Sequence, residues 1–266
     1  MIAIADQAIA TRNSLKTGPT RASGALQFVR SKRLGTPLLA TLSLLALYLW
    51  LNTLELDSIE QRTINSEYLV NRIIEHLQLT LAASAIVAVI AIPAGILLSR
   101  TKSRIAHGII LGLANVGQAA PAIGILVLLT IIFSTGFNIA LIGLVAYSIL
   151  PILRNTMVGI EQVDARIVES ARGVGMTSRQ VLFRIQLPLA IPVILAGLRT
   201  TLVFAVGVAS LATFVNAGGL GDIIVNGIKL QRMPVLLTGS VITACIALFI
   251  DWIASLVEDL LRPKGM

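Results

Sequence analysis

Charged residues are scarce in this sequence. Only 13% of its 266 residues are Asp, Glu, Lys or Arg, whereas 56% are hydrophobic, and the mean hydropathy is +0.88. Soluble globular domains carry about 25% charged residues. The composition therefore excludes an ordinary soluble domain and indicates a membrane protein.

The residue patterns of common catalytic and metal sites are missing as well. Cys245 is the single cysteine, so no intrachain disulfide can form, and its hydrophobic surroundings favour a packing role. His76 and His107 lie far apart, and neither has a further histidine or a cysteine at ligand spacing. No nucleophile–base pair is evident, and there is no Gly-x4-Gly-Lys-Ser/Thr phosphate-binding loop. We therefore expect no metal site, no catalytic residue and no ATP hydrolysis by this chain itself.

Long hydrophobic runs dominate what remains, and the ten-residue alternating segments of a membrane barrel are absent. Backbone groups in hydrocarbon must be hydrogen-bonded internally, so these runs predict helices. Six spans are predicted, at about 37–54, 74–99, within 105–133, 137–153, 191–215 and 236–256. The predicted fold class is all-α, a polytopic membrane helix bundle.

The net charge of +8 is concentrated in particular loops, which points to membrane topology and lipid rather than to nucleic acid. Residues 1–36 carry six basic residues and one acidic residue, whereas residues 55–75 carry five acidic and two basic ones. The positive-inside rule then puts both termini in the cytoplasm, with only Lys229 and Arg232 as a weak exception. A signal peptide is the alternative for the first run, but no small-x-small cleavage site follows it, which favours an uncleaved span.

A polar, basic stretch interrupts the hydrophobic runs at 169–188, with the sequence ESARGVGMTSRQVLFRIQLP. Gly175 can relax the backbone at a bend, Thr177 or Ser178 can cap a second helix, and Pro188 can start the next element. The stretch therefore predicts two short helices joined by a turn. Charge bias places it in the cytoplasm, between the fourth and fifth spans.

This stretch resembles the cytoplasmic loop of ABC importer permeases, which reads Glu-Ala-Ala, three residues, Gly, nine residues, Ile-x-Leu-Pro. Ser170 replaces the first Ala, and the other motif positions match at the family's spacing; with Gly173, the residues concerned are Glu169, Ser170, Ala171, Gly175, Ile185, Leu187 and Pro188. The resemblance implies coupling helices, within about 159–188, that dock into a groove on a separate ATPase. Arg172 and Arg179 are candidates for pairing with acidic groups there. An ordinary surface helical hairpin is the alternative.

The resemblance also implies partners and a domain plan. We expect two ATPase subunits that bind ATP and magnesium, a second permease that is identical or related, an extracytoplasmic solute-binding protein, and a location in the bacterial inner membrane. Residues 77–260 would form the permease domain of the type I importer kind. Residues 1–36 would be a mostly flexible cytoplasmic tail, 37–76 the first span with an outer loop, and 261–266 a cytoplasmic tail.

Asn115, Gln118 and Pro121 interrupt the third predicted span, which is long enough to need a tilt or a break. Polar groups at membrane depth usually face the bundle interior or a cavity, and proline frees a backbone carbonyl. These residues are candidates for a kinked segment that lines the translocation pathway. Helix–helix packing, helped by small neighbours, is the alternative.

A glycine-rich segment follows the fifth span and contains Asn216, Gly218, Gly219 and Gly221. Several glycines together predict a tight turn or a re-entrant loop, although a plain outer loop is the alternative. The segment resembles the Ala-Gly-Gly-Leu-Gly segment of permeases for glycine betaine, choline and carnitine. That resemblance covers about 77–260 and implies import of such a solute.

Three further classes stay open: a permease for an amino acid or other small solute, an ATPase-independent transporter, and a membrane scaffold or sensor. The second would predict an inverted repeat or paired intramembrane charges, and the sequence shows neither. Instead, we expect the Arg199 side chain to extend towards the lipid headgroups. Two further pairs of neighbours should lie at the membrane surfaces: Asp251 with Trp252, and Glu75 with His76.

Overall fold

The computed structural model describes residues 21–101 and 103–261, and the regular elements within them are all helices. Five helical stretches there are long and hydrophobic enough to cross a membrane: Leu34–Leu51 within α2 (Arg21–Leu51), α4 (Ser66–Arg100), α7 (Phe137–Glu161), the stretch Ser178–Val215 that contains α10 (Leu187–Ala209), and α12 (Met233–Leu261). A bent pair, α5 (Arg104–Ala119) with α6 (Ala122–Ile132), makes a sixth if it is counted as one span. The predicted all-α bundle is confirmed.

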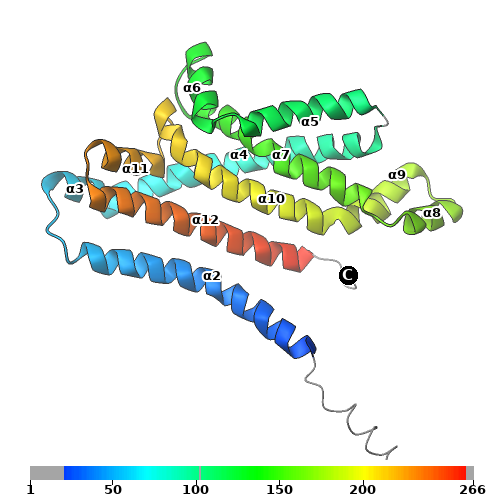
Figure 1. The fold of residues 1–266 in the computed structure, drawn as a ribbon, viewed down its shortest axis with the longest axis horizontal. Coiled ribbons are helices and arrows are strands. Elements are labelled where there is room, and N and C mark those ends of the chain that lie inside the picture. Colours follow the sequence, from blue (N-terminus) through cyan, green and yellow to red (C-terminus); the bar gives the residue numbers. More distant parts are fainter. Residues whose placement is uncertain (1–20, 102, 262–266) are drawn as a thin grey trace, which may run out of the picture.

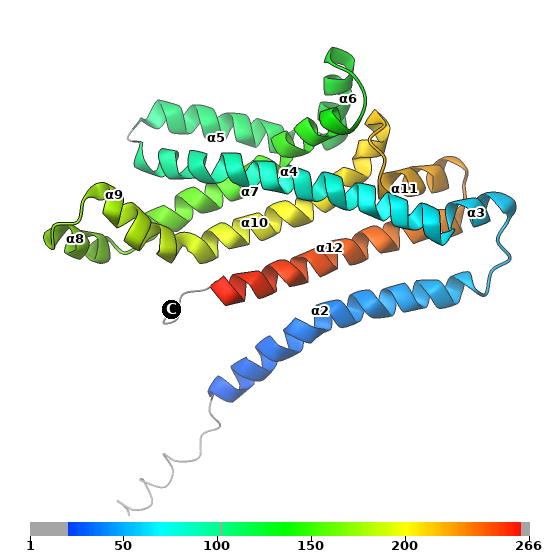
Figure 2. The same ribbon diagram turned by 180° about the vertical axis from the view of Figure 1, so that it is seen from behind.

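The long helices lie side by side in an elongated bundle (Figures 1 and 2). α7 and α10 lie at its centre, with α4 against both, α5 at one edge, and α12 followed by α2 at the other. Two short helices, α8 (Ala165–Gly173) and α9 (Ser178–Val181), form one end, which we call the hairpin end. Another two, α3 (Ser58–Thr63) and α11 (Leu220–Lys229), lie at the opposite end, which we call the glycine end.

Polar side chains start several of the helices. Asp57 accepts hydrogen bonds from the first turn of α3, and the Glu60 carboxylate accepts one from the Asp57 backbone in return. Asn65 caps α4 and Ser103 caps α5 in the same way. Each cap satisfies an N–H group that a helix start leaves without a partner, so these short polar links fix where α3, α4 and α5 begin.

The centre of the bundle is packed through small residues. A Cβ added at Gly95 on α4 would lie 2.7 Å from the Thr156 Cβ on α7, and one at Gly197 on α10 would lie 2.7 Å from the Asn155 Cβ. Alanines are fully buried on the facing helices, for example Ala91 and Ala205. Because lipid is as apolar as leucine, close backbone contact rather than a hydrophobic driving force holds such helices together.

The third predicted span is broken. α5 and α6 meet at an angle of 100°, and Pro121 is the residue immediately before α6. The expected break is confirmed, because α6 turns away from α5 and stands out from the bundle in Figure 1. Proline at this point lacks the N–H that would continue α5.

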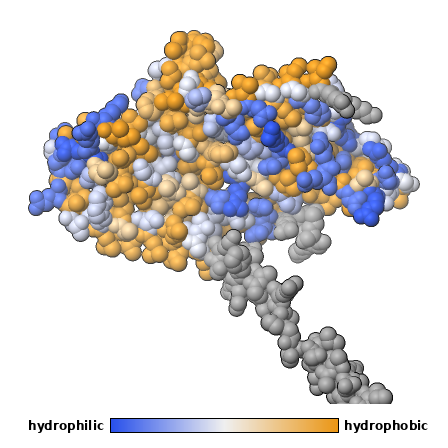
Figure 3. Space-filling view, in the orientation of Figure 1, coloured by the Kyte–Doolittle hydropathy of each residue, from blue (hydrophilic) through white to orange (hydrophobic). Residues whose placement is uncertain are grey.

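The first helix starts earlier than the sequence indicates. α2 begins at Arg21 and contains Pro37, so residues 21–36 of the predicted tail belong to this helix. Residues 1–20 and 262–266, and with them the rest of both predicted tails, lie outside the described residues. Only 6% of the hydrophobic window of α2 is buried inside the chain. This agrees with the mainly hydrophobic middle of the surface in Figure 3, which has hydrophilic residues gathered towards its two ends.

Candidate functional site

The polar stretch folds as a helical hairpin at the end of the bundle. α8 follows α7 after a short link in which Asp164 accepts a hydrogen bond from the Arg166 amide at 2.8 Å. The Arg166 guanidinium also donates to the Asp164 carboxylate at 2.7 Å, and these contacts hold the pKa of Asp164 below its ordinary value. The start of α8 is therefore capped and carries a fixed negative charge, which suits a helix N-terminus.

The turn between the two hairpin helices depends on Gly175, whose φ is +85°. The Met176 amide donates to the Ala171 carbonyl at 3.1 Å and the Gly175 amide to the Arg172 carbonyl at 2.9 Å, which closes the end of α8. Thr177 then caps α9 through a reciprocal pair of hydrogen bonds with Gln180. The predicted bend and the predicted cap at Thr177 are both confirmed.

Most of the motif residues at the tip are exposed. Glu169, Ser170, Arg172, Gly173 and Gly175 are exposed, as is Arg179, whose guanidinium lies 5.9 Å from the centre of the Phe183 ring. Ala171 is 7% exposed and anchors the hairpin. A Cβ at Gly173 or Gly175 would meet nothing within 4 Å. Among the residues that the structure describes, no atom therefore requires the small size of these two glycines, and the space beside them is open to a partner.

The hairpin continues into α10 through a π-helical turn, η1 (Leu182–Gln186). The Leu187 amide donates to the carbonyl of Leu182, five residues earlier, instead of four. Ile185 and Leu187 are half-buried, and Pro188 lies in the first turn of α10, as predicted. The motif thus joins an exposed hairpin to a central membrane helix without a flexible break.

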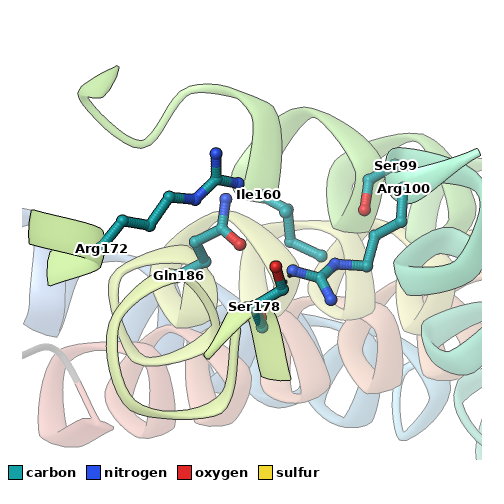
Figure 4. Close-up of a pocket in the computed structure, with 6 residues that line it drawn as sticks. All are labelled: Ser99, Arg100, Ile160, Arg172, Ser178 and Gln186. Carbon is teal, nitrogen blue, oxygen red and sulfur yellow. Dashed lines mark hydrogen bonds between the residues drawn. The ribbon is translucent and has the colours of Figure 1, made fainter. Parts of the chain in front are cut away.

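A hollow of about 350 Å³ lies between the hairpin and the bundle (Figure 4), lined by Ser99, Arg100, Ile160, Arg172, Ser178 and Gln186. Arg100, the last residue of α4, donates from Nη2 to the Ser178 carbonyl at 2.9 Å across this space. Its contact with Ser178 depends on how α4 and α9 are placed in the fold, which no local pattern reports.

The glycine-rich segment lies at the opposite end of the molecule. Asn216, Gly218 and Gly219 have φ values of 58°, 75° and 87°, so the predicted tight turn is confirmed. A Cβ at Gly221 would overlap the Ser210 carbonyl oxygen, and the Gly219 amide donates to the Glu75 carboxylate at 2.9 Å. The segment is therefore pressed closely against its neighbours, and the structure does not bring it together with the hairpin.

Charged side chains hold this segment against α4. Arg72 Nη1 lies 2.7 Å from the Glu75 carboxylate and 2.9 Å from that of Asp222, in the first turn of α11. Thr213 donates to the same Asp222 carboxylate. We call Arg72, Glu75, Asp222 and Thr213 the glycine-end cluster. His76, expected at the membrane surface, is fully buried instead, with Nε2 3.1 Å from a backbone carbonyl of α10, so that expectation is wrong.

The polar residues near the break of the third span have different surroundings. Asn115 accepts a hydrogen bond from Arg154 Nη2 at 3.1 Å, which ties α5 to α7. Gln118 is half-buried, and Pro121 is exposed. Asn115 thus takes part in a contact between helices, whereas Gln118 and Pro121 remain candidates for the pathway.

An ion pair joins two spans. Arg199 on α10 and Asp251 on α12 face each other through two contacts of 2.5 and 2.6 Å, and Glu258 lies 3.9 Å from the same guanidinium. The expectation of no paired charges within the spans is therefore wrong. Each residue is a charge in an otherwise hydrophobic run, which is the signal that could have suggested the pair.

Residues 91–264 match the family described as binding-protein-dependent transport system inner membrane component. The chain belongs to this family. It is therefore a multi-pass inner-membrane permease subunit of an ABC transporter that also has an ATPase and a binding protein, the ATPase being a separate subunit. The resemblance read from the Glu169–Pro188 stretch is confirmed.

Relatives with curated names cover most of the permease. A carnitine transport permease protein of Listeria monocytogenes is 42% identical over 200 residues, which are 75% of this chain and 89% of the relative. A choline transport system permease protein of Bacillus subtilis is 37% identical over 202 residues, or 76% of this chain and 92% of the relative. An osmoprotectant import permease protein of Salmonella typhimurium is 36% identical over 222 residues, or 84% and 92%.

Solved structures support the fold. A chain of the MetNI methionine ABC transporter superimposes with a TM-score of 0.66 at 23% identity, covering 78% of this chain and all of that one. A chain of an amino acid ABC transporter crystallised with histidines has the same TM-score at 18% identity and the same coverage. At these identities the likeness shows the permease fold alone.

Proposed function

We propose that this chain forms the translocation pathway of an ATP-driven importer for osmoprotectants with a quaternary ammonium group, such as glycine betaine, choline or carnitine. The observation that carries the proposal is the identity of 36–42% to permeases named for carnitine, choline and osmoprotectants. The tight glycine-rich turn at Gly218 and Gly219, which resembles that of such permeases, lies inside the matched region and supports it. An amino acid importer is the second candidate; the likeness to solved amino acid transporters, at 23% identity or less, shows the shared fold alone.

The assembly that we propose has two permease subunits, two ATPases and one extracytoplasmic binding protein. The hairpin end faces the cytoplasm with both termini, and the exposed tip from Glu169 to Gly175 docks into the ATPase, where ATP and magnesium bind. Open space beside Gly173 and Gly175, and the exposure of Arg172 and Arg179, support this placement. Ser170, Ala171, Ile185, Leu187 and Pro188 then hold the docking surface on α10.

Transport in this proposal needs no chemistry on the permease. ATP binding moves the docked hairpin, and η1 passes the displacement to α10, because the helical backbone continues from Gln186 at the end of η1 to Leu187 at the start of α10 without an intervening loop. The ATPase must favour one arrangement of the spans over the other by a few kcal/mol for such a switch to be nearly complete. A hairpin that is stiff and correctly seated is sufficient.

Gln118 and Pro121 are our candidates for lining the pathway, at the break between α5 and α6. We expect Gln118→Ala to change the KM for uptake several-fold while the ATPase stays bound, because the half-buried amide does not lie in the hairpin. Asn115→Ala is the matched control: it removes the amide that bonds Arg154 and should lower thermal stability more than it changes KM. Unchanged kinetics in Gln118→Ala would assign this residue to helix packing instead.

The test of the substrate is uptake of labelled glycine betaine into proteoliposomes that contain this chain, its ATPase and its binding protein. We expect uptake that requires ATP and that unlabelled choline or carnitine competes away, while methionine and histidine do not. Competition by the amino acids instead would replace the proposal with the second candidate. Uptake without ATP would contradict the role of the hairpin as an ATPase-docking element.

A further inference from the structure

Helix α4 reaches both ends of the molecule. It has 35 residues, from Ser66 to Arg100, which at about 1.5 Å per residue is about 50 Å, well beyond a hydrocarbon core of about 30 Å. Its two ends therefore extend past the lipid on both sides. One end contacts the hairpin and the other contacts the glycine-rich segment (Figure 1).

The contact at the hairpin end is a single charged hydrogen bond. Arg100 Nη2 donates to the Ser178 carbonyl, and within the described residues no other side-chain hydrogen bond or ion pair joins α4 to the hairpin. The 350 Å³ hollow separates the rest of the hairpin from the end of α4. A displacement of α9 can thus reach α4 directly through Arg100, as well as through η1 and α10.

The contact at the glycine end is a network. Arg72 bridges Glu75 and Asp222, and Glu75 accepts from the Gly219 amide, so one turn of α4 holds both the tight turn and the first turn of α11. The partners Glu75 and Asp222 are 38% and 24% exposed in their side chains, which limits screening by water. Movement of α4 would pull this segment with it.

The middle of α4 is packed tightly enough to transmit such a displacement. Val87, Ala91 and Leu98 are buried against α7, and Gly95 lies in contact range of Thr156 there. The helix continues through Pro93 without a break. Packed interiors change between discrete arrangements rather than deforming gradually.

We infer that α4 is a second mechanical link, parallel to the η1–α10 connection, between the ATPase-docking hairpin and the glycine-rich segment, with Arg100 and Arg72 as its positioning residues at either end. The inference rests on the proposed function for the docking role of the hairpin. It adds to that function a route by which ATP binding reaches the opposite surface, and it does not depend on which solute is carried.

The first measurement is the number of ATP molecules hydrolysed per solute imported, in proteoliposomes with the ATPase and the binding protein. We expect Arg100→Ala to raise this ratio about tenfold, the factor set by loss of one charge-assisted hydrogen bond, and Arg72→Ala, which loses two such contacts, to raise it at least as much, with hydrolysis largely kept in both. Arg100→Lys, which keeps a charged donor, should restore the ratio. Arg62→Ala is the control, because this arginine is exposed, lies outside the hairpin and α4, and forms no side-chain hydrogen bond or ion pair among the described residues.

The second measurement needs no solute. Spin labels on Asn71→Cys in α4 and Thr135→Cys beside α6, in a Cys245→Ser background, report their separation by pulsed electron paramagnetic resonance with and without ATP; both sites are exposed. We expect the full complex to show an ATP-dependent change in distance that Arg100→Ala abolishes. The wild-type complex could show the ATP-dependent change in distance, and Arg100→Ala could abolish it, while no solute with a quaternary ammonium group is imported. In that case the proposed substrate class is wrong and the link through α4 is supported.

Several results would overturn the link. Uptake and hydrolysis that fall together in Arg100→Ala, at an unchanged ratio, would make Arg100 a docking or folding residue. A raised ratio in Arg100→Ala without one in Arg72→Ala would show that the route does not extend to the glycine end. An ATP-dependent change in distance that survives Arg100→Ala, or that is absent from the wild-type complex, would show that α4 does not transmit the displacement of the hairpin.

Discussion

Substitutions of Gly175 should distinguish two effects on the coupling hairpin: the cost of a positive φ for a residue with a Cβ, and the cost of side-chain volume. The φ of +85° is in the left-handed region, yet a Cβ there would meet nothing within 4 Å. A residue with a Cβ pays about 1–2 kcal/mol in this conformation, which corresponds to a factor of about 5–30 in the population of the native turn. Gly175→Ala should therefore lower coupled uptake by a factor in this range, without a clash inside the chain.

Three variants make this prediction sharp. Gly175→Asn should recover most of the loss, because asparagine tolerates left-handed backbone better than alanine. Gly175→Trp should lose more than Gly175→Ala, since the indole also occupies the space that we assign to the ATPase. Gly173→Ala is the matched comparison: it adds the same methyl group to the proposed docking surface, but within α8 and without a positive φ, so the fold itself should be unchanged or slightly stabilised, by about 0.5–1 kcal/mol.

The assay is uptake and ATP hydrolysis of each variant in proteoliposomes, at equal amounts of inserted permease. Bound ATPase is measured after purification through the permease. Equal activity in Gly175→Ala and Gly173→Ala would refute the argument from backbone strain. Normal uptake in Gly175→Trp would refute the placement of the ATPase against this turn.

Three other perturbations test particular contacts. Asp251→Leu should destabilise the fold by about 1–3 kcal/mol, between values for exposed and buried pairs, because it leaves Arg199 half-buried without this partner; adding Arg199→Leu should recover part of the loss in thermal unfolding. Gly221→Ala should cost about 1–3 kcal/mol because its Cβ overlaps backbone, whereas Gly207→Ala, with nothing within 4 Å, should unfold like the wild type. The hydrogen bond from the Glu60 amide lowers the pKa of Asp57 below its ordinary 3.8. The ionised Asp57 therefore stabilises the start of α3 fully above the ordinary pKa, and this stabilisation is lost as the pH falls through the lower pKa of the folded state. The measurement is hydrogen-exchange protection of the first α3 amides in the wild type, divided by their protection in Asp57→Asn at the same pH. This ratio should decline below about pH 4, and a ratio that stays constant would contradict the prediction.

Local patterns in the sequence account for much of the fold. Hydrophobic runs located the spans, Gly175 and Thr177 located the hairpin turn and its cap, and Pro121 located the break in the third span. Each of these features is encoded within a few residues, by hydrophobic length, by tolerance of positive φ or by a missing amide hydrogen. Neighbouring residues are sufficient to specify them.

Contacts between distant segments could not be found in this way. Arg72 and Asp222 are 150 positions apart, Arg100 and Ser178 are 78 apart, and Arg199 and Asp251 are 52 apart. A single sequence shows which residues are charged, but the pairing depends on which helices become neighbours. The burial of His76 has the same origin, because it depends on how α10 packs against α4.

The two short helices at the glycine end were missed for a different reason. α3 and α11 lie in segments that the sequence indicated as outer loops. For α3 a local signal did exist, since Asp57 followed three residues later by Glu60 is a capping box. Glycines in and around α11 predicted a turn rather than a helix. Contacts that no local pattern reports hold α11 in place, namely its packing against α12 and the glycine-end cluster.

The π-helical turn at Leu182–Gln186 makes residue number, and not only residue type, part of the coupling motif. In a continuous helix every residue added or removed rotates all that lies beyond it by about 100°. The extra residue in this turn therefore sets the azimuth at which the hairpin leaves α10, and the nine positions between Gly175 and Ile185 include it. A one-residue deletion here would keep almost every side chain and still turn the docking face about 100° away from its partner.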